Sequence, residues 1–436
     1  MELSDALAWL DRHIDLEKTA AIAGRSAGLS LDRMRGLVAA LGDPQRDQPT
    51  VHLTGTNGKG STARMLTELI SVQGLSVGTY TSPHLERLNE RIARDGQPIP
   101  DVELARVLGD LAVVESAFDP DVSYFELLTA AAFRWFSDVA VEAAVVEVGL
   151  LGRWDATNVV DAEVAVLTNV ALDHTDGVGD WRRRVAEEKA GIVKPGATFV
   201  LGEADPDLRA VFDATPAART WRRGVDFACT ADRLAVGGRL VDLRTPGAAY
   251  DEVFLPLHGP HQADNAALAV TAAEAFFDRP LDGEVVAEAL ARVRVPGRFE
   301  VVQHHPLLVL DGAHNPAGAD ALAATLGDGF HPAGELRLVV GTLAGRDPRR
   351  LLEPLGVDHA AEVVVCTPPS PRGLPAAELA RIVGDLGGRP TVVPEVGRAL
   401  QVALAEAGPD DLVLVTGSLY TVGAARAALR RLGAVA

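Results

Sequence analysis

The feature of this sequence that most constrains its fold is the stretch VHLTGTNGKGST at residues 51–62. An apolar run ending in Thr54 is followed by three glycines around a single lysine, Lys59, and then by a helical pattern. Glycines let the backbone turn so that its N–H groups converge on one anion, and the positive end of the following helix strengthens such a site. The stretch therefore predicts a buried strand, a phosphate-binding loop and a helix.

The spacing of this loop differs from the common pattern G-x-x-x-x-G-K-[ST]. Leu53 stands where the first glycine would be, and Gly60 separates Lys59 from Ser61. An ordinary glycine-rich turn between a strand and a helix is the alternative. The lysine, which can neutralise phosphate, and the neighbouring hydroxyl, which can reach Mg²⁺, favour a nucleotide site.

Composition narrows the set of possible partners. The 436 residues carry a formal net charge of −19, which argues against general affinity for nucleic acid or anionic membranes, because binding phosphates needs clustered cations. Cys229 and Cys366 lie far apart and indicate no disulfide framework, and the charged opening MELSDALAWLDRHID is unlike a signal peptide. We therefore expect a cytoplasmic protein without membrane-spanning segments.

Strand patterns alternate with helical patterns along most of the chain, which is typical of parallel α/β sheets. The segment VRVPGRFE at 293–300 interrupts this alternation with a proline and a glycine. We predict an α/β fold with a P-loop-type ATP-binding domain at 1–293, a linker at 294–299 and a smaller Rossmann-like domain at 300–436. The first sheet should be mostly parallel and the second parallel, and residues 220–257 should add a small β-sheet.

Polar residues follow several predicted strands, at the edge where open parallel sheets bind ligands. Glu147 ends the apolar strand at 143–148, and we favour a ligand role for it over an exposed edge carboxylate. His174 lies between two aspartates and could bind metal or phosphate, although an isolated histidine usually makes a structural hydrogen bond. Lys189 follows two glutamates, so a solvated helix face with a salt bridge is its alternative.

The second domain carries two polar segments after predicted strands, DGAHNP at 311–316 and TGSLYTVG at 416–423. Asp311 and His314 could instead cap the next helix, with Asn315-Pro316 as its start. A nucleotide held between two α/β domains is the simplest interpretation of the pattern. Phosphoryl transfer needs positioning, Mg²⁺ and cations more than it needs a nucleophilic side chain.

The order of the motifs resembles that of the folylpolyglutamate synthase/dihydrofolate synthase family: GTNGKGS, TSPHLERLNERI, YFELLTAAAF, VEVGLLGRWDATN, LDHTD, EKAGIVKPG, HGPHQADNAALA, VPGRFE, DGAHNP and TGSLY. The resemblance to these Mur-ligase-like amide ligases covers nearly the whole chain, except the region near 205–250. It implies that ATP phosphorylates a carboxylate of dihydropteroate, or of the terminal glutamate of a folate. The amino group of L-glutamate would then attack the acyl phosphate.

The resemblance also implies roles for individual residues. The ATP phosphates would be bound by Thr56, Asn57, Gly58, Lys59, Gly60 and Ser61, with further nucleotide contacts from Asn265, Arg298 and Asp311. The ligands of Mg²⁺, of which two ions are expected, would be Ser82, Glu147, His174 and Lys189, the last as a carbamylated lysine. Glutamate or the acyl phosphate would be oriented by Arg91, His314 and Ser418, so that Lys59, Lys189, His314 and Ser418 form the catalytic set. The pterin would face Phe125, Asp155 and Ala156; for Phe125 and Ala156 core packing is an almost equal alternative.

Three departures from the family's motifs bear on these expectations. Two lie in the stretch that matches the family pattern GLGGRLDATN, and one lies in the stretch GTLAGRDP of the second domain. Leu151 stands in place of a glycine and Trp154 in place of a leucine, so the loop after Glu147, and the pterin site with it, should have a different shape. Arg346 replaces a common lysine and keeps its charge but not its donor geometry.

Two other functions compete with this interpretation. A Mur-type cell-wall ligase is disfavoured because the first 50 residues are helical and offer no evident domain for a UDP-linked substrate. A non-catalytic nucleotide-binding regulatory protein would be expected to lack Glu147, His174 or Lys189, and all three are present. We therefore expect pteroate or folate, L-glutamate and ATP as partners, with no nucleic acid or membrane, and a monomer.

Overall fold

The computed structural model describes residues 1–15, 30–115, 122–173, 178–330 and 333–434. The chain divides into two compact units. The first contains 1–84, 88–256 and 261–294, and the second contains 85–87, 257–260 and 295–436. Two short segments of the earlier chain thus belong with the second unit, and the domain limits inferred from the sequence stay a prediction.

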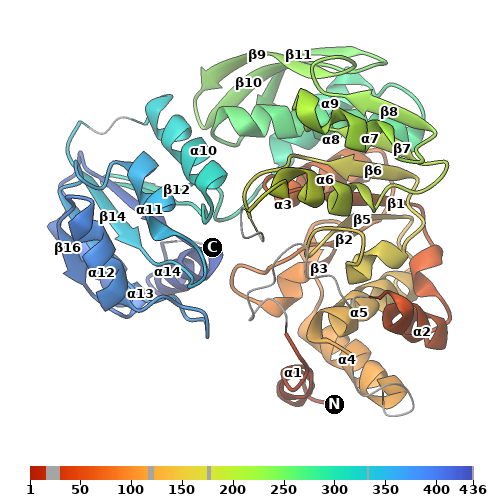
Figure 1. Cartoon of the computed structure of the whole chain (residues 1–436), viewed down its shortest axis with the longest axis horizontal. Coiled ribbons are helices and arrows are strands. Elements are labelled where there is room, and N and C mark those ends of the chain that lie inside the picture. Colours follow the sequence, from red (N-terminus) through yellow and green to blue (C-terminus); the bar gives the residue numbers. More distant parts are fainter. Residues whose placement is uncertain (16–29, 116–121, 174–177, 331–332, 435–436) are drawn as a thin grey trace. The chain divides into compact units, whose positions relative to one another are not determined.

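A mostly parallel sheet forms the centre of the first unit, and its described strands follow the order β4-β3-β2-β5-β1-β6-β7-β8 (Figure 1). The parallel strands are β1 (Thr50–Thr54), β2 (Val77–Tyr80), β5 (Ala143–Glu147), β6 (Val164–Leu167), β7 (Thr198–Leu201) and β8 (Arg219–Arg222). An antiparallel edge is added by β3 (Ile92–Arg94) and β4 (Gln97–Pro98). Every residue of β1, β5 and β6 is buried, because helices cover both faces of such a sheet, and this explains the continuous apolar runs of these strands.

The described helices of the first unit include the one predicted after the phosphate loop. They are α1 (Leu3–Leu10), α2 (Asp32–Ala40), α3 (Lys59–Val72), α4 (Asp101–Glu115), α5 (Tyr124–Asp138), α6 (Trp181–Ala190), α7 (Arg209–Asp213), α8 (Pro260–Phe277) and α9 (Gly283–Arg292). Short 3₁₀ turns lie at η2 (Pro44–Arg46), η3 (Leu88–Arg91), η4 (Ala156–Val159) and η5 (Pro206–Leu208).

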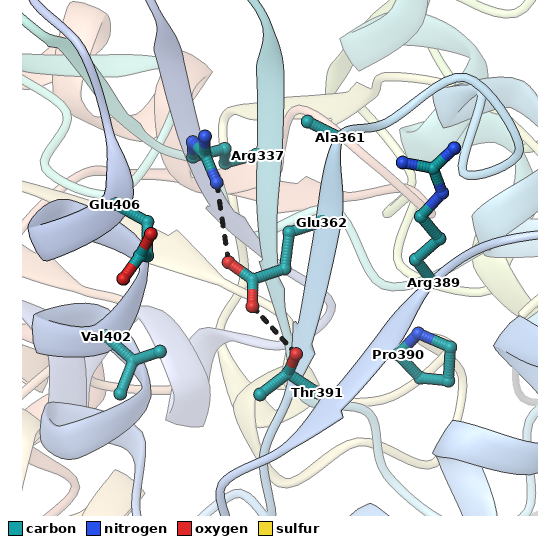
Figure 2. A pocket seen from close by; sticks show the side chains of 8 residues that line it. All are labelled: Arg337, Ala361, Glu362, Arg389, Pro390, Thr391, Val402 and Glu406. Atoms are coloured by element: carbon teal, nitrogen blue, oxygen red, sulfur yellow. Dashed lines mark hydrogen bonds and ion pairs between the residues drawn. The ribbon is translucent and has the colours of Figure 1, made fainter.

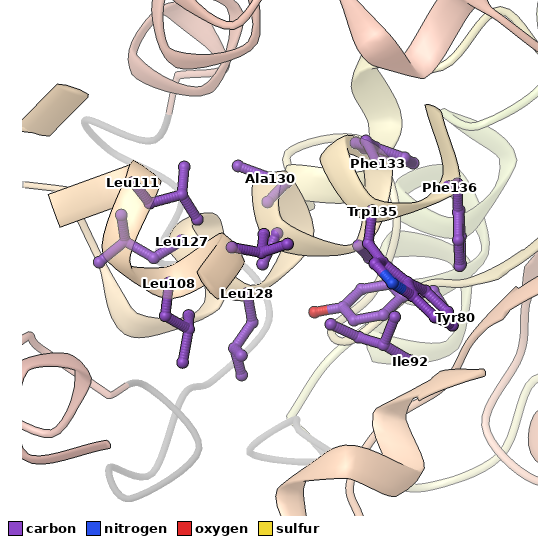
Figure 3. Packing of buried hydrophobic residues seen from close by; sticks show 14 of the residues in the cluster. Tyr80, Ile92, Leu108, Leu111, Leu127, Leu128, Ala130, Phe133, Trp135 and Phe136 are labelled. Carbon is purple, nitrogen blue, oxygen red and sulfur yellow. The ribbon is translucent and has the colours of Figure 1, made fainter. Parts of the chain in front are cut away.

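Helix α5 shows how local sequence and packing agree. Its start is a capping box, in which the Ser123 hydroxyl accepts from the Glu126 N–H and the Glu126 carboxylate accepts from the Ser123 N–H. The apolar face of α5 then packs into the core shown in Figure 3. The ring of Phe136 lies against β2 so closely that a Cβ on Gly78 would be 2.7 Å from it, which explains the glycine in the strand.

Residues 228–255 form the small sheet predicted at 220–257. Its antiparallel strands are β9 (Ala228–Ala235), β10 (Gly238–Arg244) and β11 (Ala249–Leu255). The start of the predicted region behaves differently, because Arg219–Arg222 joins the edge of the large sheet as β8. Within the described residues, no helix is long and apolar enough to cross a membrane.

The second unit contains a mixed sheet whose described strands follow the order β12-β13-β17-β14-β15-β16. Its strands are β12 (Glu300–His304), β13 (Leu307–Leu310), β14 (Leu336–Val340), β15 (Glu362–Val365), β16 (Pro390–Val392) and β17 (Leu412–Thr416). Its helices are α10 (Pro316–Gly327), α11 (Pro348–Leu352), α12 (Ala376–Asp385), α13 (Val396–Glu406) and α14 (Leu419–Arg431), with a 3₁₀ turn at η6 (Glu353–Leu355).

The prediction of a purely parallel second sheet is wrong at one edge. Strand β12 pairs antiparallel with β13, and only residues 305 and 306 connect them. A connection this short can join only antiparallel neighbours, because a parallel pair needs a crossover of a dozen or so residues. The other strands of this sheet are parallel, as predicted.

Candidate active site

The loop between β1 and α3 has the geometry of an anion-binding site. Gly58 is the N-cap of α3 and has a φ of 85°, a left-handed conformation that favours glycine. The helix begins at Lys59, so the N–H groups of its first turn, which have no partner within the helix, lie at the end of the loop. Together with the helix dipole they favour a bound phosphate. The predicted succession of strand, loop and helix is confirmed.

Lys59 lies beside the carboxylate that ends the neighbouring strand. Its Nζ donates to the backbone carbonyls of Gly55 and Thr56 at 3.1 and 3.4 Å, and is 3.9 Å from Oε1 of Glu147. Glu147 Oε2 accepts from the Ser82 N–H at 3.4 Å. Because β5 lies between β1 and β2, the loops after three adjacent strands converge here. The alternative of an exposed edge carboxylate is wrong, since Glu147 is 4% exposed on a central strand.

Lys189 is buried near this cluster. It is 4% exposed, and burial followed by the positive charge of Lys59 lowers its pKa well below the ordinary value, against the opposing charges of Asp173 and Asp155. A solvated helix face with a salt bridge is therefore excluded for this lysine. Its side chain adjoins Lys59 closely enough for their charges to interact.

The remaining predicted metal ligand, His174, lies outside the described residues. Among the residues that are described, no group of three or more histidine, cysteine, aspartate or glutamate side chains is arranged to hold a metal ion. The motifs do not predict a group made of these four residue types alone, because the expected ligands include a serine, Ser82, and a lysine, Lys189. The hydroxyl of Ser82 and the carboxylate of Glu147 are hard oxygen donors of the kind that Mg²⁺ prefers.

The loop after Glu147 is fixed against the C-terminal end of α6. The Arg153 N–H donates to the Glu188 carbonyl at 2.8 Å, and a Cβ on Gly152 would lie 2.8 Å from the same oxygen. Leu151 has a φ of 60°, in the left-handed region. This conformation costs leucine roughly 1–2 kcal/mol. The expectation that leucine gives the loop a different shape stays a prediction.

Asp155 uses its carboxylate inside this loop. It accepts from the Leu150 N–H at 2.7 Å, and from the N–H and hydroxyl of Thr157 at 3.0 and 2.5 Å, while burial raises its pKa. The Thr157 hydroxyl is also 2.9 Å from Nε2 of His52. Since that hydroxyl donates to Asp155, it accepts from His52, so Nε2 carries the hydrogen. The predicted contact between Asp155 and substrate stays a prediction.

His52 gives the fold a measurable pH dependence. Burial, helped by the charge of Lys194, lowers the pKa of His52 from 6.5 to about 3. Between these values the unfolded chain binds a proton that the folded chain does not, so stability falls as the pH falls from about 6.5 toward 3. We expect His52→Gln to reduce the loss of unfolding free energy between pH 7 and pH 5 by about 2 kcal/mol, measured by urea unfolding.

A matched control for this measurement is His359→Gln, because the His359 side chain is 87% exposed. We expect the control to lose as much stability between the two pH values as the unmodified protein does. Equal losses in the unmodified protein and in His52→Gln would contradict the assignment of a buried, neutral His52.

Two of the residues expected to face the pterin, Phe125 and Ala156, differ in their surroundings. A Cβ on Gly149 would be 2.4 Å from the Phe125 ring, so this half-buried ring packs directly on the loop after Glu147. Ala156 is 7% exposed and belongs to the hydrophobic core, as its alternative interpretation holds. Arg91 is 2% exposed, and its Nε donates to Nδ1 of His84 at 3.0 Å.

Helix α8 contributes its first turns to the phosphate loop. A Cβ on Gly58 would lie 2.6 Å from Oδ1 of Asn265, so this side chain abuts the loop. Asn265 Nδ2 donates to Gln262 Oε1 at 3.0 Å, and Gln262 Nε2 donates to the Ser61 hydroxyl at 3.4 Å. Asn265 is therefore next to the loop that it is predicted to serve, and Gln262 is a neighbour that the sequence did not indicate.

The predicted residues of the second unit lie after neighbouring strands of its sheet. The Asp311 carboxylate accepts from the N–H groups of Phe299 and Ala313, both at 2.8 Å. Burial raises the pKa of Asp311, and the charge of Arg298 opposes that shift. The side chain of Arg298 approaches Gly312 so closely that a Cβ there would lie 2.3 Å from its Nη1. The linker and the loop after β13 are thus tied together at Asp311.

Asn315 is the N-cap of α10 and accepts from the Gly318 N–H at 2.8 Å, so the helix start at Asn315-Pro316 is confirmed, while the N-cap is neither Asp311 nor His314. His314 Nδ1 donates to the Gly312 carbonyl at 2.8 Å. Arg346 donates to the His314 carbonyl at 3.1 Å. Ser418, by contrast, does cap a helix: its hydroxyl accepts from the Thr421 N–H at 3.1 Å.

A cavity of about 460 Å³ in the second unit lies away from these residues. Figure 2 shows that Arg337, Glu362 and Thr391 line it, at the amino ends of β14, β15 and β16. Glu362 accepts from the Thr391 hydroxyl at 2.7 Å and lies 3.6 Å from Arg337. Its half-buried charges are thus paired with each other, and parallel sheets bind ligands at the opposite end of their strands.

Sequence reasoning missed Thr168 and Asn169, which contact the phosphate loop from the end of β6. The sequence places these two residues directly after a predicted strand and gives no other indication of their role. The pairing of β6 with β1, which brings them to the loop, is a property of the folded sheet.

Comparison with known proteins agrees with this arrangement. The model of the Mur ligase middle domain matches residues 104–273, and that of the Mur ligase glutamate ligase domain matches residues 297–419. A dihydrofolate synthase/folylpolyglutamate synthase of Mycobacterium tuberculosis is 38% identical over 91% of this chain and 89% of its own. The Mycobacterium tuberculosis folylpolyglutamate synthase complexed with ADP and AMPPCP has a TM-score of 0.90 at 37% identity, covering 98% and 97% of the two chains. The bifunctional synthase of Yersinia pestis complexed with AMPPNP and Mn ion has a TM-score of 0.85 at 30% identity, covering 99% and 98%.

Proposed function

Given that this chain belongs to the folylpolyglutamate synthase/dihydrofolate synthase family of Mur ligases, we propose how its residues carry out the family's reaction. The chain is an ATP-dependent ligase that adds L-glutamate to dihydropteroate, to the γ-carboxylate of a folate, or to both. The observation that carries the proposal is the cluster of Lys59, Glu147 and the Ser82 loop around the start of α3.

A carboxylate reacts with an amine only after one of its oxygens becomes a good leaving group. In the proposed reaction a carboxylate oxygen of the pterin substrate attacks the γ-phosphorus of ATP, and ADP leaves. The amine of glutamate then attacks the acyl carbon, loses a proton and expels phosphate. Lys59 and the N–H groups at the start of α3 stabilise the charge on the phosphates during the first step.

The enzyme uses ATP and a divalent metal. We propose that two Mg²⁺ ions are held by Ser82, Glu147, Lys189 and, from outside the described residues, His174. The donor set fits, because the buried Glu147 carboxylate and a hydroxyl are oxygen ligands beside a phosphate loop. When bound, Mg²⁺ offsets the negative charge of the phosphates.

Lys189 suits this set only if it becomes an anion. We propose that its amine adds to CO₂, forming an N–C bond and releasing a proton, so that a carbamate replaces the ammonium. Burial supports this modification, because it lowers the Lys189 pKa and only the neutral amine is nucleophilic. The carbamate oxygens would then serve as metal ligands.

The remaining assignments concern the second half of the chain and the substrates. Asn265, Arg298 and Asp311 are proposed to contact the nucleotide, and Arg91, His314 and Ser418 to orient glutamate or the acyl phosphate. We propose that 1–293 and 300–436 act as separate domains joined by 294–299, in a monomer working in the cytoplasm, where both free thiols would persist.

The acceptor profile tests the proposed function. We expect ADP release from ATP and Mg²⁺ to require both L-glutamate and either dihydropteroate or tetrahydrofolate. Release with a UDP-muramyl peptide but with neither pterin would assign the chain to cell-wall synthesis. Nucleotide binding without turnover of any acceptor would instead indicate a regulatory protein. The same assay shows whether one or both ligase activities are present.

A further inference from the structure

The phosphate loop is held from the side by the residues that follow β6. Asn169 Oδ1 accepts from the Asn57 N–H at 3.0 Å, and its Nδ2 donates to the Asn57 carbonyl at 3.1 Å. This is the two-point pairing that a neighbouring strand would make. The Thr168 hydroxyl donates to the same Asn57 carbonyl at 2.6 Å, and the Asn169 carbonyl accepts from the Thr56 N–H at 3.0 Å.

The contact extends in both directions along the loop. A Cβ on Gly55, whose φ is 151°, would lie 1.8 Å from the Thr168 hydroxyl, so this glycine is required by the contact itself. At the other end, the Ala171 N–H donates to the Thr56 hydroxyl at 3.0 Å. Residues 55–57 are therefore fastened to residues 168–171, and the segment that fastens them continues directly to Asp173 and the predicted metal ligand His174.

These hydrogen bonds divide the loop into two parts. The backbone N–H groups of Thr56 and Asn57 are used within the protein, whereas those at the start of α3 point out of the helix end, where an anion binds. A glycine-rich loop without these hydrogen bonds to residues 168–171 would have to be ordered by the nucleotide. The conformational entropy lost in that ordering would weaken nucleotide binding.

We propose that Asn169, assisted by Thr168, is a positioning residue for ATP, which holds Thr56 and Asn57 so that the N–H groups of Gly58–Ser61 face the phosphates. The proposal rests on the proposed function, since it concerns the nucleotide site of the ligase. Under this proposal the backbone N–H groups of Thr56 and Asn57 do not bind phosphate. They bond to Asn169 and hold the loop in place. The proposal also makes residues 168–171 and the phosphate loop parts of one hydrogen-bonded structure.

Binding of ADP to the full chain, measured by titration calorimetry, tests the proposal. We expect Asn169→Ala to weaken ADP binding by about tenfold or more, because it removes both side-chain hydrogen bonds to Asn57. In steady-state assays its KM for ATP should rise while its KM for glutamate stays unchanged. Thr168→Val removes the separate hydrogen bond from the Thr168 hydroxyl to the Asn57 carbonyl and keeps the side-chain shape, so it should show a smaller change in the same direction.

The matched control is Tyr250→Phe in the same unit. The Tyr250 hydroxyl is buried and bonded to Glu274 and Leu281, so this change removes hydrogen bonds away from the loop. It should lower stability but leave ADP binding unchanged. The proposal is refuted if the unmodified protein binds ADP and Asn169→Ala binds it with a dissociation constant within twofold of that of the unmodified protein. If Asn169→Ala does not fold, unchanged ADP binding by Thr168→Val refutes the proposal. If the unmodified protein binds no ADP, the proposed function itself fails.

Discussion

Replacing Lys59 by alanine should lower the rate of glutamate-dependent ADP release by about 10³-fold. Lys59 is the cation of the phosphate loop, and its Nζ already rests on the carbonyls of Gly55 and Thr56, 3.9 Å from Glu147. Removing it leaves the charge on the transferred phosphate and the buried carboxylate without this partner. Lys194 offers no replacement, because its Nζ donates to the Asn158 carbonyl at 2.9 Å.

The comparison variant is Lys59→Arg, which keeps the positive charge but spreads it over a planar group. We expect its activity to lie between those of the alanine variant and the unmodified protein. Urea unfolding of all three proteins separates loss of catalysis from loss of folding. Turnover by Lys59→Ala within tenfold of the unmodified enzyme would show that the loop does not bind the reacting phosphates in the way proposed.

Replacing Lys189 by alanine should lower turnover by about 100-fold, the second largest effect that we expect. The reason is chemical: the carbamate of Lys189 would contribute an anionic ligand for metal in place of a buried amine of lowered pKa, and alanine contributes no ligand. Lys189→Arg should be similarly impaired, because a guanidinium is positively charged and does not form the carbamate.

Carbon-13 NMR provides a measurement of the modification that does not depend on activity. Protein equilibrated with ¹³C-bicarbonate should show a carbamate resonance that Lys189→Ala lacks, with Lys194→Ala as the control that retains it. Absence of this resonance in the unmodified protein, or full activity of Lys189→Arg, would exclude a carbamylated Lys189.

Much of the architecture could be predicted from local patterns. Runs such as AAVV at 143–146 and VAVL at 164–167 are apolar throughout because both faces of the sheet are covered, and these residues form β5 and β6 as expected. The hairpin of β12 and β13 was not predicted, since its signal is a two-residue connection within a polar stretch rather than a periodic pattern. Leu151 adopts a left-handed backbone, which a side chain disfavours but does not prevent.

The motifs alone determined that this chain has a glycine-rich phosphate loop, strand-end polar groups and the organisation of a glutamate ligase family, because each of these is written in contiguous residues. Only the tertiary structure decided which of these groups meet. The order of strands brings Glu147 to Lys59 and Asn169 to Asn57, and burial converts Lys189 from an ordinary helix lysine into a group with a strongly lowered pKa. Strand order and desolvation arise from packing between segments far apart in sequence, and no local pattern encodes them.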